Sequence, residues 1–467
     1  MIVAELIPPP DPEAAFARFA AREHCVFFDS ARRDPLLGRY SFLAAEPFEF
    51  LRCEVSDADA LGRLSRLLDQ FTSETLPHLP PFQGGAAGLL SYDLGRQFEK
   101  IPSPRIDEFG TPALAVGLYD VVLAWDHATN RAWLISQGFP ENDPAARQAR
   151  AEQRLQHFQE LLQSPTPPKA APSSNSSTTV LPRESLAPLF PVEGWPGLTS
   201  NLSPEDYLGT VRRGVEYVYA GDIFQVNLAQ RLLYPAVDDA RSLYVRLRQR
   251  NPATFAGYFD LGDQQIVSAS PERFLSVYDR RIEARPIKGT RRRTRRPEAD
   301  LYAGDDLVQS EKDRAENVMI VDLLRNDLSQ VCIDDSVRVT QLCRLEIYEF
   351  VQHLVSAVQG TLRPDLGPLD AVRAAFPGGS ITGAPKIRAM EIIAELEPTA
   401  RGAYCGSLAY FGFDGAMDAS ILIRTVTAAR GWWQLPVGGG ITAQSDPVRE
   451  YEETWHKAEG MLRALEP

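Results

Sequence analysis

The sequence predicts an α+β fold, because its strands come in runs and its helices come separately. Short alternating apolar segments follow one another at 254–260, 265–269, 272–278 and 281–285. Their connections are too short for crossovers, so these strands must pair antiparallel. Helical patterns occur later, at 310–326, 368–376, 384–396 and 447–465, with strands at 404–412, 419–428 and 432–436 between them. The absence of regular strand–helix–strand alternation favours α+β over a parallel α/β sheet.

The composition indicates a globular chain with two domains or one large bilobal unit. It has 467 residues, of which 44% are hydrophobic and 24% charged, which exceeds the size at which one core usually stops growing. A net charge of -13 works against a general affinity for nucleic acid or anionic lipid. The chain shows neither an apolar run long enough to span a bilayer nor a secretory signal. We therefore expect a cytoplasmic protein with no nucleic-acid and no membrane partner.

The chain divides into three predicted parts. Residues 1–163 are mostly strands, among them 113–125 and a hairpin across 127–130, and they end in a helix from about Pro144. Residues 164–195 are rich in Pro and Ser and are predicted to be a flexible linker. Residues 196–467 form the predicted catalytic domain. The five cysteines are widely spaced and never paired as CxxC, which argues against disulfides and zinc.

Two predicted helices each carry a stripe of carboxylates. Asp313 and Glu316 share one helix face, and Glu450, Glu453 and Lys457 fall on one stripe of the terminal helix. If both stripes face one pocket, they suit Mg²⁺, which takes a few carboxylates together with water and a ligand anion. Taken alone, each stripe is also compatible with an ordinary solvated helix face.

A lysine and a glutamate are candidates for covalent and acid–base chemistry. Lys288 lies in a tight turn between Pro286 and Gly289. It can act as a nucleophile only when its ammonium group is deprotonated, which burial favours. Glu272, beside a proline at the start of a strand, is a candidate general acid. The alternatives are a solvated loop lysine and a strand-edge charge paired with Arg273.

Two glycine-rich segments and one arginine indicate anion binding. The loop 377–386 precedes a helix, and the glycines 438–440 follow a predicted strand, so the amides of either segment can hold a carboxylate. A flexible turn is the alternative for the triple glycine. Arg424 lies in a predicted apolar strand, where a buried guanidinium needs an anionic partner. The basic run 291–296 lacks interleaved aromatics and is interpreted as a solvated loop.

Together these segments resemble the chorismate-utilising enzymes. The resemblance is strong from about residue 202 to 465 and weak before the linker. It implies a large antiparallel β sandwich wrapped by helices, in which the N-terminal part contributes strands and the linker is an excursion within one unit. It rests on the motifs SPERF at 270–274, PIKGT at 286–290, EKDRAENVMIVDLLRND at 311–327, AFPGGSITGAPK at 375–386, GGGI at 438–441 and EYEET at 450–454.

The resemblance also implies a role for each candidate residue. Glu316 and Glu453 match the positions that hold Mg²⁺, with Asp313 and Glu450 in supporting acidic positions. Asp313 departs from the glutamate that is common there in relatives. The positions implied to bind chorismate, either at its carboxylates or beside its ring, are Thr290, His353, Thr382, Tyr404, Arg424, Gly438, Gly439, Gly440 and Lys457.

Within the family, two positions distinguish between reactions. Members that add water to chorismate carry a lysine base where this chain has Gln225. Members that form anthranilate usually carry alanine where this chain has Lys288, and a lysine there is characteristic of members that aminate chorismate at C4. The resemblance therefore implies a covalent lysine mechanism that gives 4-amino-4-deoxychorismate for p-aminobenzoate and folate. The alternative is formation of anthranilate, with loss of pyruvate.

The ammonia must come from elsewhere, because the chain has no Gly-x-Cys-x-Gly nucleophile turn of a glutamine amidotransferase. The resemblance implies a separate glutamine amidotransferase subunit in a heterodimer. The segments around Ser30 and at Gly38, Arg39 and Tyr40 resemble the tryptophan-binding pocket of the family, with Thr254, Phe255 and Ala256 as its other wall. Such a pocket is either regulatory or structural. A rival from another class is a non-catalytic tryptophan-binding partner of a glutaminase.

Overall fold

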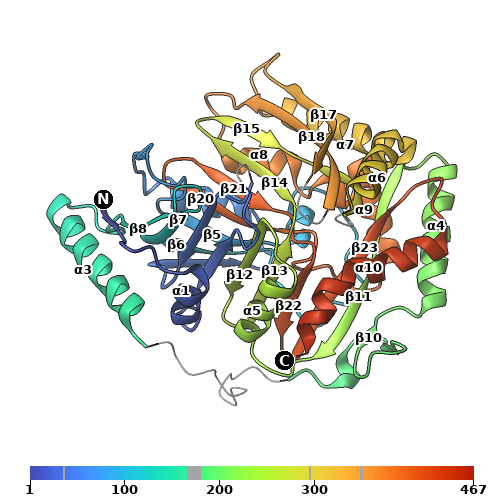
Figure 1. The fold of residues 1–467 in the computed structure, drawn as a ribbon, viewed down its shortest axis with the longest axis horizontal. Coiled ribbons are helices and arrows are strands. Elements are labelled where there is room, and N and C mark those ends of the chain that lie inside the picture. Colours follow the sequence, from blue (N-terminus) through green and yellow to red (C-terminus); the bar gives the residue numbers. More distant parts are fainter. Residues whose placement is uncertain (35–36, 166–179, 294–295, 348–350, 467) are drawn as a thin grey trace.

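The structure, a computed structural model, describes residues 1–34, 37–165, 180–293, 296–347 and 351–466. Its strands form two large antiparallel sheets with helices packed around them (Figure 1). The strands of the first sheet are β1 Ile2–Glu5, β2 Val26–Asp29, β3 Tyr40–Ala44, β7 Val121–Asp126, β8 Arg131–Ser136, β9 Phe190–Pro191, β10 Thr199–Ser200, β11 Gln225–Pro235, β12 Phe255–Asp260, β13 Gln264–Ser270, β19 Gly383–Ala384, β22 Thr425–Ala429 and β23 Trp432–Ile441.

The second sheet is smaller. Its strands are β4 Glu49–Cys53, β5 Gly85–Leu90, β6 Leu114–Tyr119, β14 Arg273–Tyr278, β15 Arg281–Ala284, β16 Ile287–Arg292, β17 Arg338–Ile347, β18 Val351–Thr361, β20 Ser407–Gly412 and β21 Met417–Ser420. Within the described residues, the first sheet has 13 strands in the order β1-β8-β7-β3-β2-β12-β13-β22-β23-β11-β10-β9, with β19 beside β11. The second has 10 over the same residues, in the order β16-β18-β15-β14-β21-β20-β5-β6-β4, with β17 beside β18. The predicted α+β fold with large antiparallel sheets is confirmed.

The α helices are α1 Pro12–Phe19, α2 Ala60–Leu68, α3 Pro144–Gln163, α4 Pro204–Tyr219, α5 Ala240–Arg250, α6 Pro297–Gln309, α7 Glu311–Ser329, α8 Pro368–Ala375, α9 Lys386–Leu396 and α10 Pro447–Leu465; the 3₁₀ turns are η1 Tyr92–Gln97, η2 Arg183–Ser185 and η3 Gly379–Ile381. Side-chain caps fix several starts. The Ser203 hydroxyl accepts a hydrogen bond from the Asp206 amide at α4, and Ser310 does the same for the Asp313 amide at α7. Sequence patterns missed α2, α5 and α6.

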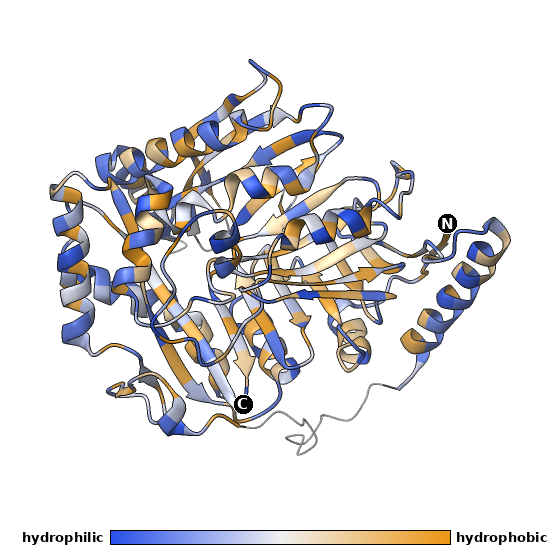
Figure 2. Ribbon diagram, turned by 180° about the vertical axis from the view of Figure 1, so that it is seen from behind, coloured by the Kyte–Doolittle hydropathy of each residue, from blue (hydrophilic) through white to orange (hydrophobic). Residues whose placement is uncertain are grey.

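The two sheets pack face to face through apolar side chains. Val26 and Phe42 of the first sheet share a buried cluster with Ala87 and Leu89 of the second. Figure 2 shows the strands coloured mostly as hydrophobic, while outer helices such as α3 alternate between hydrophilic and hydrophobic residues. The alternation along the outer helices is the pattern of elements that bury one face only. Among the described residues, no helix is both long and apolar enough to cross a membrane.

Two segments predicted as single strands are in fact pairs of strands in different sheets. The segment 113–125 is divided at Asp120, where the chain leaves β6 in the second sheet and enters β7 in the first. The segment 419–428 is divided between β21 and β22 in the same way. Because both halves are buried on both faces, an apolar pattern cannot show where the chain changes sheet.

Both sheets contain strands from either side of the predicted linker. β2 pairs with β12, and β5 pairs with β20. Residues 166–179 of the linker lie outside the described residues, and the division of the chain at 164–195 stays a prediction. The N-terminal part therefore contributes directly to the sheets that support the C-terminal part.

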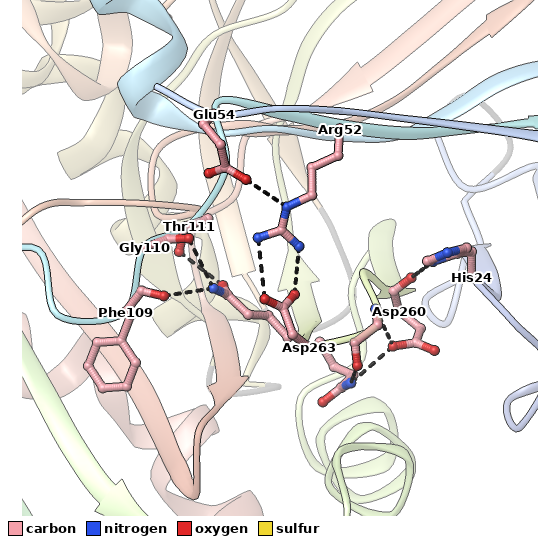
Figure 3. A network of polar contacts seen from close by, with 11 residues as sticks. His24, Arg52, Glu54, Phe109, Gly110, Thr111, Asp260 and Asp263 are labelled. Atoms are coloured by element: carbon pink, nitrogen blue, oxygen red, sulfur yellow. Dashed lines mark hydrogen bonds and ion pairs between the residues drawn. The ribbon is translucent and has the colours of Figure 1, made fainter. Parts of the chain in front are cut away.

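A polar network ties the two sheets together at one edge (Figure 3). Arg52 on β4 donates to both carboxylate oxygens of Asp263, in the turn between β12 and β13, and its Nε donates to Glu54. Nearby, the side chain of Gln264 donates to the carbonyl of Phe109 at 2.9 Å. The Arg52 pair is partly exposed and contributes little energy by itself, but it positions the turn between β12 and β13 against β4.

Candidate active site

A cavity of about 1250 Å³ gathers most of the predicted site residues. Its walls come from the two sheets, from the loop before α9, and from α7 and α10, so it lies where the chain's distant segments meet. Among the residues predicted for catalysis, substrate binding or metal binding, those that line it are Glu272, Lys288, Asp313, Glu316, His353, Tyr404, Arg424, Gly438, Gly440, Glu450, Glu453 and Lys457.

Two predicted substrate-binding residues, Thr382 and Gly439, are not among those that line the cavity. Thr382 is fully buried, and its hydroxyl donates to the carbonyl of Gly378 at 2.9 Å. Gly439 faces α10, where a Cβ would come within 3.2 Å of a Glu450 carboxylate oxygen. Thr290 pairs through its backbone with His353, and its side chain lies outside the described part of the structure. Their roles toward substrate stay predictions.

Lys288 and Glu272 are joined through one residue that the sequence did not single out. The Lys288 Nζ donates to the carbonyl oxygen of Ser380 at 3.1 Å, and the Ser380 hydroxyl donates to Glu272 Oε1 at 3.0 Å. Ser380 belongs to η3, in the glycine-rich loop before α9. The loop therefore contributes to the cavity through Ser380 and Ile381, whereas the first turn of α9 does not line it.

Burial controls the protonation of Glu272. The side chain is almost fully buried, and this burial raises the pKa of its carboxyl above the ordinary value. The positive charge of Lys288 and the hydrogen bond from Ser380 act in the opposite direction and lower that pKa, but they do not cancel the effect of burial. A glutamate with a raised pKa, next to an amine, is a plausible proton donor inside the cavity.

The carboxylates of α7 line one wall of the cavity. Burial raises the pKa of Glu316, against the opposing charges of Lys288 and Lys312, while the like charges of Asp313 and Glu450 raise it further. Lys312 also lies 3.5 Å from Glu450, so it bridges α7 and α10. The sequence argument overlooked this lysine, although it stands directly before Asp313.

The carboxylates of α10 line the facing wall. Glu450 is 4% exposed and accepts a hydrogen bond from the Ser445 hydroxyl at 2.7 Å. Glu453 lies 2.7 Å from Lys457, whose Nζ also donates to the Gly438 carbonyl at 2.8 Å. Burial tends to raise the pKa of Glu453, but Lys457, Lys312 and Lys288 together outweigh it and the pKa is lowered. Both acidic stripes predicted from the sequence thus face one cavity.

The donor chemistry of these carboxylates fits a magnesium ion. Mg²⁺ binds through one or two carboxylates, with water and substrate oxygens completing its shell, and Glu316 and Glu453 supply such a pair from facing helices. Besides burial, the like charges of Asp313 and Glu450 raise the pKa of Glu316, and this repulsion is the kind that a cation relieves. Over the residues that the structure describes, no group of three or more His, Cys, Asp or Glu side chains is arranged to hold a metal by itself.

Two anion-binding predictions need correction in their local structure. The glycines 438–440 do not follow a strand: they lie within β23 and pair with β11, for example Gly440 with Asn227. Arg424 is not in a strand either, because it stands between β21 and β22 with a positive φ of 53°. An arginine in that backbone region is unusual, and here it marks the point where the chain crosses between sheets beside the cavity. Of the basic run, Arg291 and Arg292 belong to β16 rather than to a loop, and Arg291 pairs with Asp306; residues 294 and 295 lie outside the described residues.

The loop that carries Ser380 is held in place by a buried ion pair. Arg401 and Glu397 are 3% and 6% exposed, and their closest side-chain atoms are 2.6 Å apart. Arg401 also donates to the carbonyls of Ile381 and Asn227. Glu397 accepts from the Ala229 amide at 2.9 Å. The pair thus fastens η3 to β11, and no sequence motif indicated it.

His353 and Tyr404 contribute neutral polar surface to the cavity. Burial lowers the pKa of His353 to about 4, so its imidazole carries no charge near neutral pH. Burial raises the pKa of Tyr404 well above its usual range, which keeps the phenol protonated. Both groups can therefore donate or accept hydrogen bonds without adding charge.

A second cavity of about 370 Å³ lies in the N-terminal part of the first sheet and the adjoining strands of the second. Of the residues predicted to bind tryptophan, it is lined by Ser30, Arg39, Tyr40, Thr254, Phe255 and Ala256. Gly38 is not among its lining residues and packs tightly in a turn, where a Cβ would lie 2.5 Å from the Arg32 carbonyl oxygen. Leu37 and Thr254 line both cavities, so the two are neighbours.

Comparisons with known proteins agree with this geometry. The profile of the family described as chorismate binding enzyme matches residues 24–463. Anthranilate synthase component 1 of Thermus thermophilus is 42% identical over 393 residues, spanning 84% of this chain and 80% of the relative. Aminodeoxychorismate synthase component 1 of Escherichia coli is 38% identical over 468 residues, spanning 97% and 96%. The crystal structure of anthranilate synthase component I from Streptococcus pneumoniae has a TM-score of 0.76 at 31% identity and covers 92% of this chain and 93% of that one.

The chain belongs to the chorismate binding enzyme family. The resemblance inferred from the motifs is thereby confirmed at the level of the family and its fold. The relatives carry two different names at similar identities, so membership alone does not select the product.

The buried pair gives a test of what holds the site together. Glu397→Ala should lower the free energy of unfolding by about 3–5 kcal/mol, because it leaves the Arg401 guanidinium buried without its carboxylate. The double variant Glu397→Ala/Arg401→Met should be less destabilised than the single one. Urea denaturation measures both.

The exposed pair Arg213–Glu216 is a matched control, since its side chains are 50% and 63% exposed. Glu216→Ala should cost less than about 1 kcal/mol. If Glu397→Ala lowers the free energy of unfolding as little as this control does, the buried pair does not hold the site together.

Proposed function

We propose that this chain is the large subunit of an aminodeoxychorismate synthase, which converts chorismate and ammonia into 4-amino-4-deoxychorismate, a precursor of p-aminobenzoate and folate. The observation that carries the proposal is the placement of Lys288. Its amine lies in the large cavity and is linked through Ser380 to the carboxyl of Glu272. An amine and a protonatable acid in one pocket are what a covalent route through lysine requires.

The alternative is an anthranilate synthase large subunit, whose reaction places nitrogen at C2 and eliminates pyruvate. That reaction needs no amine from the protein, because ammonia itself attacks C2. Relatives of both names are similar to the chain at 42% and 38% identity, so identity does not favour either. Lys288, where anthranilate-forming members usually have alanine, favours the first proposal.

The proposed reaction gives Lys288 and Glu272 separate tasks. The deprotonated amine of Lys288 attacks C2 of chorismate, both ring double bonds shift toward C4, and the C4 hydroxyl leaves as water with a proton from Glu272. Ammonia then attacks C4, both double bonds shift back, and the amine of Lys288 is expelled from C2. Water is the only small molecule released, and the pyruvyl group stays on the ring. The burial that raises the pKa of Glu272 suits its role as acid.

The remaining cavity residues bind and orient the substrate in this proposal. Arg424, Tyr404, Lys457 and the strand amides of Gly438 and Gly440, with Gly439 between them, hold the carboxylates of chorismate. Neutral His353, with Thr290 beside it and Thr382 in the glycine-rich loop, borders the ring. Glu316 and Glu453 would hold Mg²⁺, supported by Asp313 and Glu450, and the bound ion supplies positive charge against the ring carboxylate.

The proposal includes a partner that makes ammonia. The two relatives reported above are named as component 1 of their synthases, and the present sequence lacks the nucleophile turn of a class I glutaminase. We therefore propose a heterodimer with a glutamine amidotransferase subunit.

The second cavity is proposed as a tryptophan site, which its aromatic and apolar lining, including Phe28 and Tyr410, would suit.

Product analysis tests the proposed function directly. With chorismate, Mg²⁺ and ammonium, the purified chain should form 4-amino-4-deoxychorismate, identified by mass and chromatography. Anthranilate with pyruvate would instead establish the alternative.

Removal of the metal tests the Mg²⁺ assignment. In EDTA, calorimetry should show at least tenfold weaker binding of chorismate, because a cavity with several carboxylates repels a dianion unless a cation neutralises it. Undiminished affinity would contradict the metal assignment.

Lys288→Ala tests the covalent route. In the absence of ammonia, the parent chain should form a covalent adduct with chorismate, visible by intact mass and mapping to the peptide that contains residues 286–290. The alanine variant should form none, and its residual product should drift toward anthranilate because ammonia must then attack C2. Lys100→Ala, at an exposed position outside the cavity, should retain the adduct. Formation of aminodeoxychorismate by Lys288→Ala at the parental rate would exclude this mechanism.

Ser380→Ala tests the role of Glu272 as an acid. The Ser380 hydroxyl stabilises the charged carboxylate and so lowers the pKa of Glu272; its removal should raise that pKa. Because the acid must be protonated to act, activity is lost as pH rises through its pKa, and the alkaline limb of the kcat profile should move to higher pH. Ser445→Ala, which removes a hydroxyl from Glu450 instead, should leave that limb in place. A limb that shifts equally in both variants, or in neither, would contradict the assignment.

A further inference from the structure

Asp93 is a buried carboxylate that lies outside the large cavity but beside one of its walls. It is the second residue of η1, shortly after β5, and it is 7% exposed. Because β5 pairs with β20, the turn 401–406, which leads into β20, lies beside the start of η1. A Cβ on Gly406 would come within 2.9 Å of the Tyr92 amide nitrogen, so the two segments are in direct contact.

Both backbone groups of Gly402 are bound by the start of η1. The Gly402 amide donates to Asp93 Oδ2 at 2.9 Å, and the Gly402 carbonyl accepts from the Tyr92 amide at 2.8 Å. Gly402 has a φ of 57°, in the left-handed region that favours glycine, and a Cβ there would come within 2.9 Å of Thr111 Oγ1. Contacts from the N-terminal part therefore fix the turn 401–406 at Gly402.

The turn 401–406 holds Tyr404 at the wall of the large cavity. Tyr404 is 5% exposed and lines the cavity, and its amide donates to the Arg401 carbonyl at 3.1 Å. The next amide, that of Cys405, donates to the Leu422 carbonyl at 2.8 Å. The Arg401 guanidinium lies 5.7 Å from the centre of the Tyr404 ring. A displacement of Gly402 would therefore move Tyr404, which follows two residues later in a tightly hydrogen-bonded turn.

Burial raises the pKa of Asp93 to about 6, although the hydrogen bond from the Gly402 amide lowers it. The charged groups that act on this carboxyl are Asp107 from the segment before β6, Arg96 from η1 and Arg401 from the turn. The negative charge among them raises the pKa of Asp93, and the two positive charges lower it. The neighbouring Tyr92 and Cys405 stay protonated at neutral pH, because burial raises the pKa of both groups.

The ionised form of Asp93 makes the fold less stable. The ordinary pKa of an aspartate is 3.8, whereas the folded chain holds the Asp93 proton up to about pH 6. The stability that the neutral carboxyl contributes is fully present below pH 3.8 and is lost as pH rises through about 6. At neutral pH the chain thus keeps a buried charge that costs stability beside a wall of the cavity. Such a cost is typical of residues that serve a functional site.

This inference rests on the proposed function, in which Tyr404 holds a carboxylate of chorismate. We propose that Asp93 is a positioning residue, whose ionised carboxylate holds the Gly402 amide and thereby fixes Tyr404 in the orientation that binds the substrate. A charge-assisted hydrogen bond is roughly twice as strong as a neutral one, so the ionised residue fixes the turn more firmly than the protonated one. Lys288 and Glu272 lie on other elements, so the chemical step should change little.

Asp93→Asn removes the charge and keeps an acceptor oxygen. With chorismate, Mg²⁺ and ammonium near neutral pH, the KM for chorismate should rise roughly fivefold and kcat should stay within about twofold of the parent, because only substrate binding is weakened. The matched control is Asp107→Asn. Asp107 also accepts from the amide of a left-handed glycine, Gly110 with a φ of 59°, at 3.1 Å, and neither residue lines the cavity. The control should keep the parental KM.

The pH dependence of binding gives a second readout. Each chain carries Lys288→Ala, which removes the amine that reacts with chorismate, and calorimetry measures the affinity for chorismate with Mg²⁺ on both sides of pH 6. The affinity should fall as pH falls through about 6, and adding Asp93→Asn should abolish this step. Adding Asp107→Asn should keep the step but move it to lower pH, because the charge of Asp107 raises the pKa of Asp93. A step that all chains share belongs to other groups.

Tyr404→Phe tests whether Asp93 acts through Tyr404. In this background, Asp93→Asn should change the KM by less than about twofold, because the contact that Asp93 positions is already lost. Urea denaturation near neutral pH should show that Asp93→Asn alone is at least as stable as the parent, since the buried charge is gone. A less stable Asp93→Asn chain, or a full fivefold effect in the Tyr404→Phe background, would overturn the positioning role.

Asp93→Asn with the parental KM and the parental pH step would overturn this inference and leave the proposed function standing. A parent chain that binds no chorismate in the presence of Mg²⁺ would refute the proposed function, and the role of Asp93 with it. The two failures are therefore distinguished by the parent chain alone, before any variant is compared.

Discussion

The buried pair of Glu397 and Arg401 is the interaction on which the geometry of the site depends. Two nearly unexposed charges 2.6 Å apart are stable only with full hydrogen bonding, and the backbone of β11 and η3 supplies it. Arg401 also lies 4.6 Å from the centre of the Tyr92 ring and 5.7 Å from that of Tyr404. Because Ser380 belongs to η3, the pair determines where the carbonyl that holds Lys288 and the hydroxyl that holds Glu272 are placed.

The cavity is lined by side chains of both charges and is not purely acidic. Lys288, Lys312 and Lys457 are distributed among the carboxylates, each close to at least one acid whose pKa it lowers. Where burial prevails, as at Glu272 and Glu316, the pKa remains raised; where the lysines together prevail, as at Glu453, it is lowered. Protonation states within one pocket are thus set residue by residue. Such contrast between neighbouring acids is typical of sites where one carboxyl donates a proton and another binds a cation.

Motifs in the sequence identified the walls of the cavity well, because the residues that carry chemistry lie in short, ordered segments. SPERF, PIKGT, the α7 acids and EYEET all contribute side chains to it. The residues that the sequence did not reveal connect those segments. The Ser380 carbonyl accepts from Lys288, and its hydroxyl donates to Glu272. Lys312 connects α7 to α10, and Arg401 donates to backbone carbonyls of η3 and β11. Their partners are far apart in the sequence, so no local pattern indicates them.

The sequence by itself determined the class of fold and the polarity of the α7 and α10 faces, since both follow from the spacing of apolar and charged residues along single elements. Only the tertiary structure decided where the chain changes sheet. It placed Gly438–Gly440 inside β23 rather than after it, and Arg424 in a crossing between sheets rather than in a strand. It also buried Gln225 at the start of β11, with its side chain against Gly440 of β23. A segment that is buried on both faces shows no alternation of apolar and polar residues, so its sequence does not indicate which segments lie beside it. Those neighbouring segments decide which backbone and polar side-chain groups find hydrogen-bond partners.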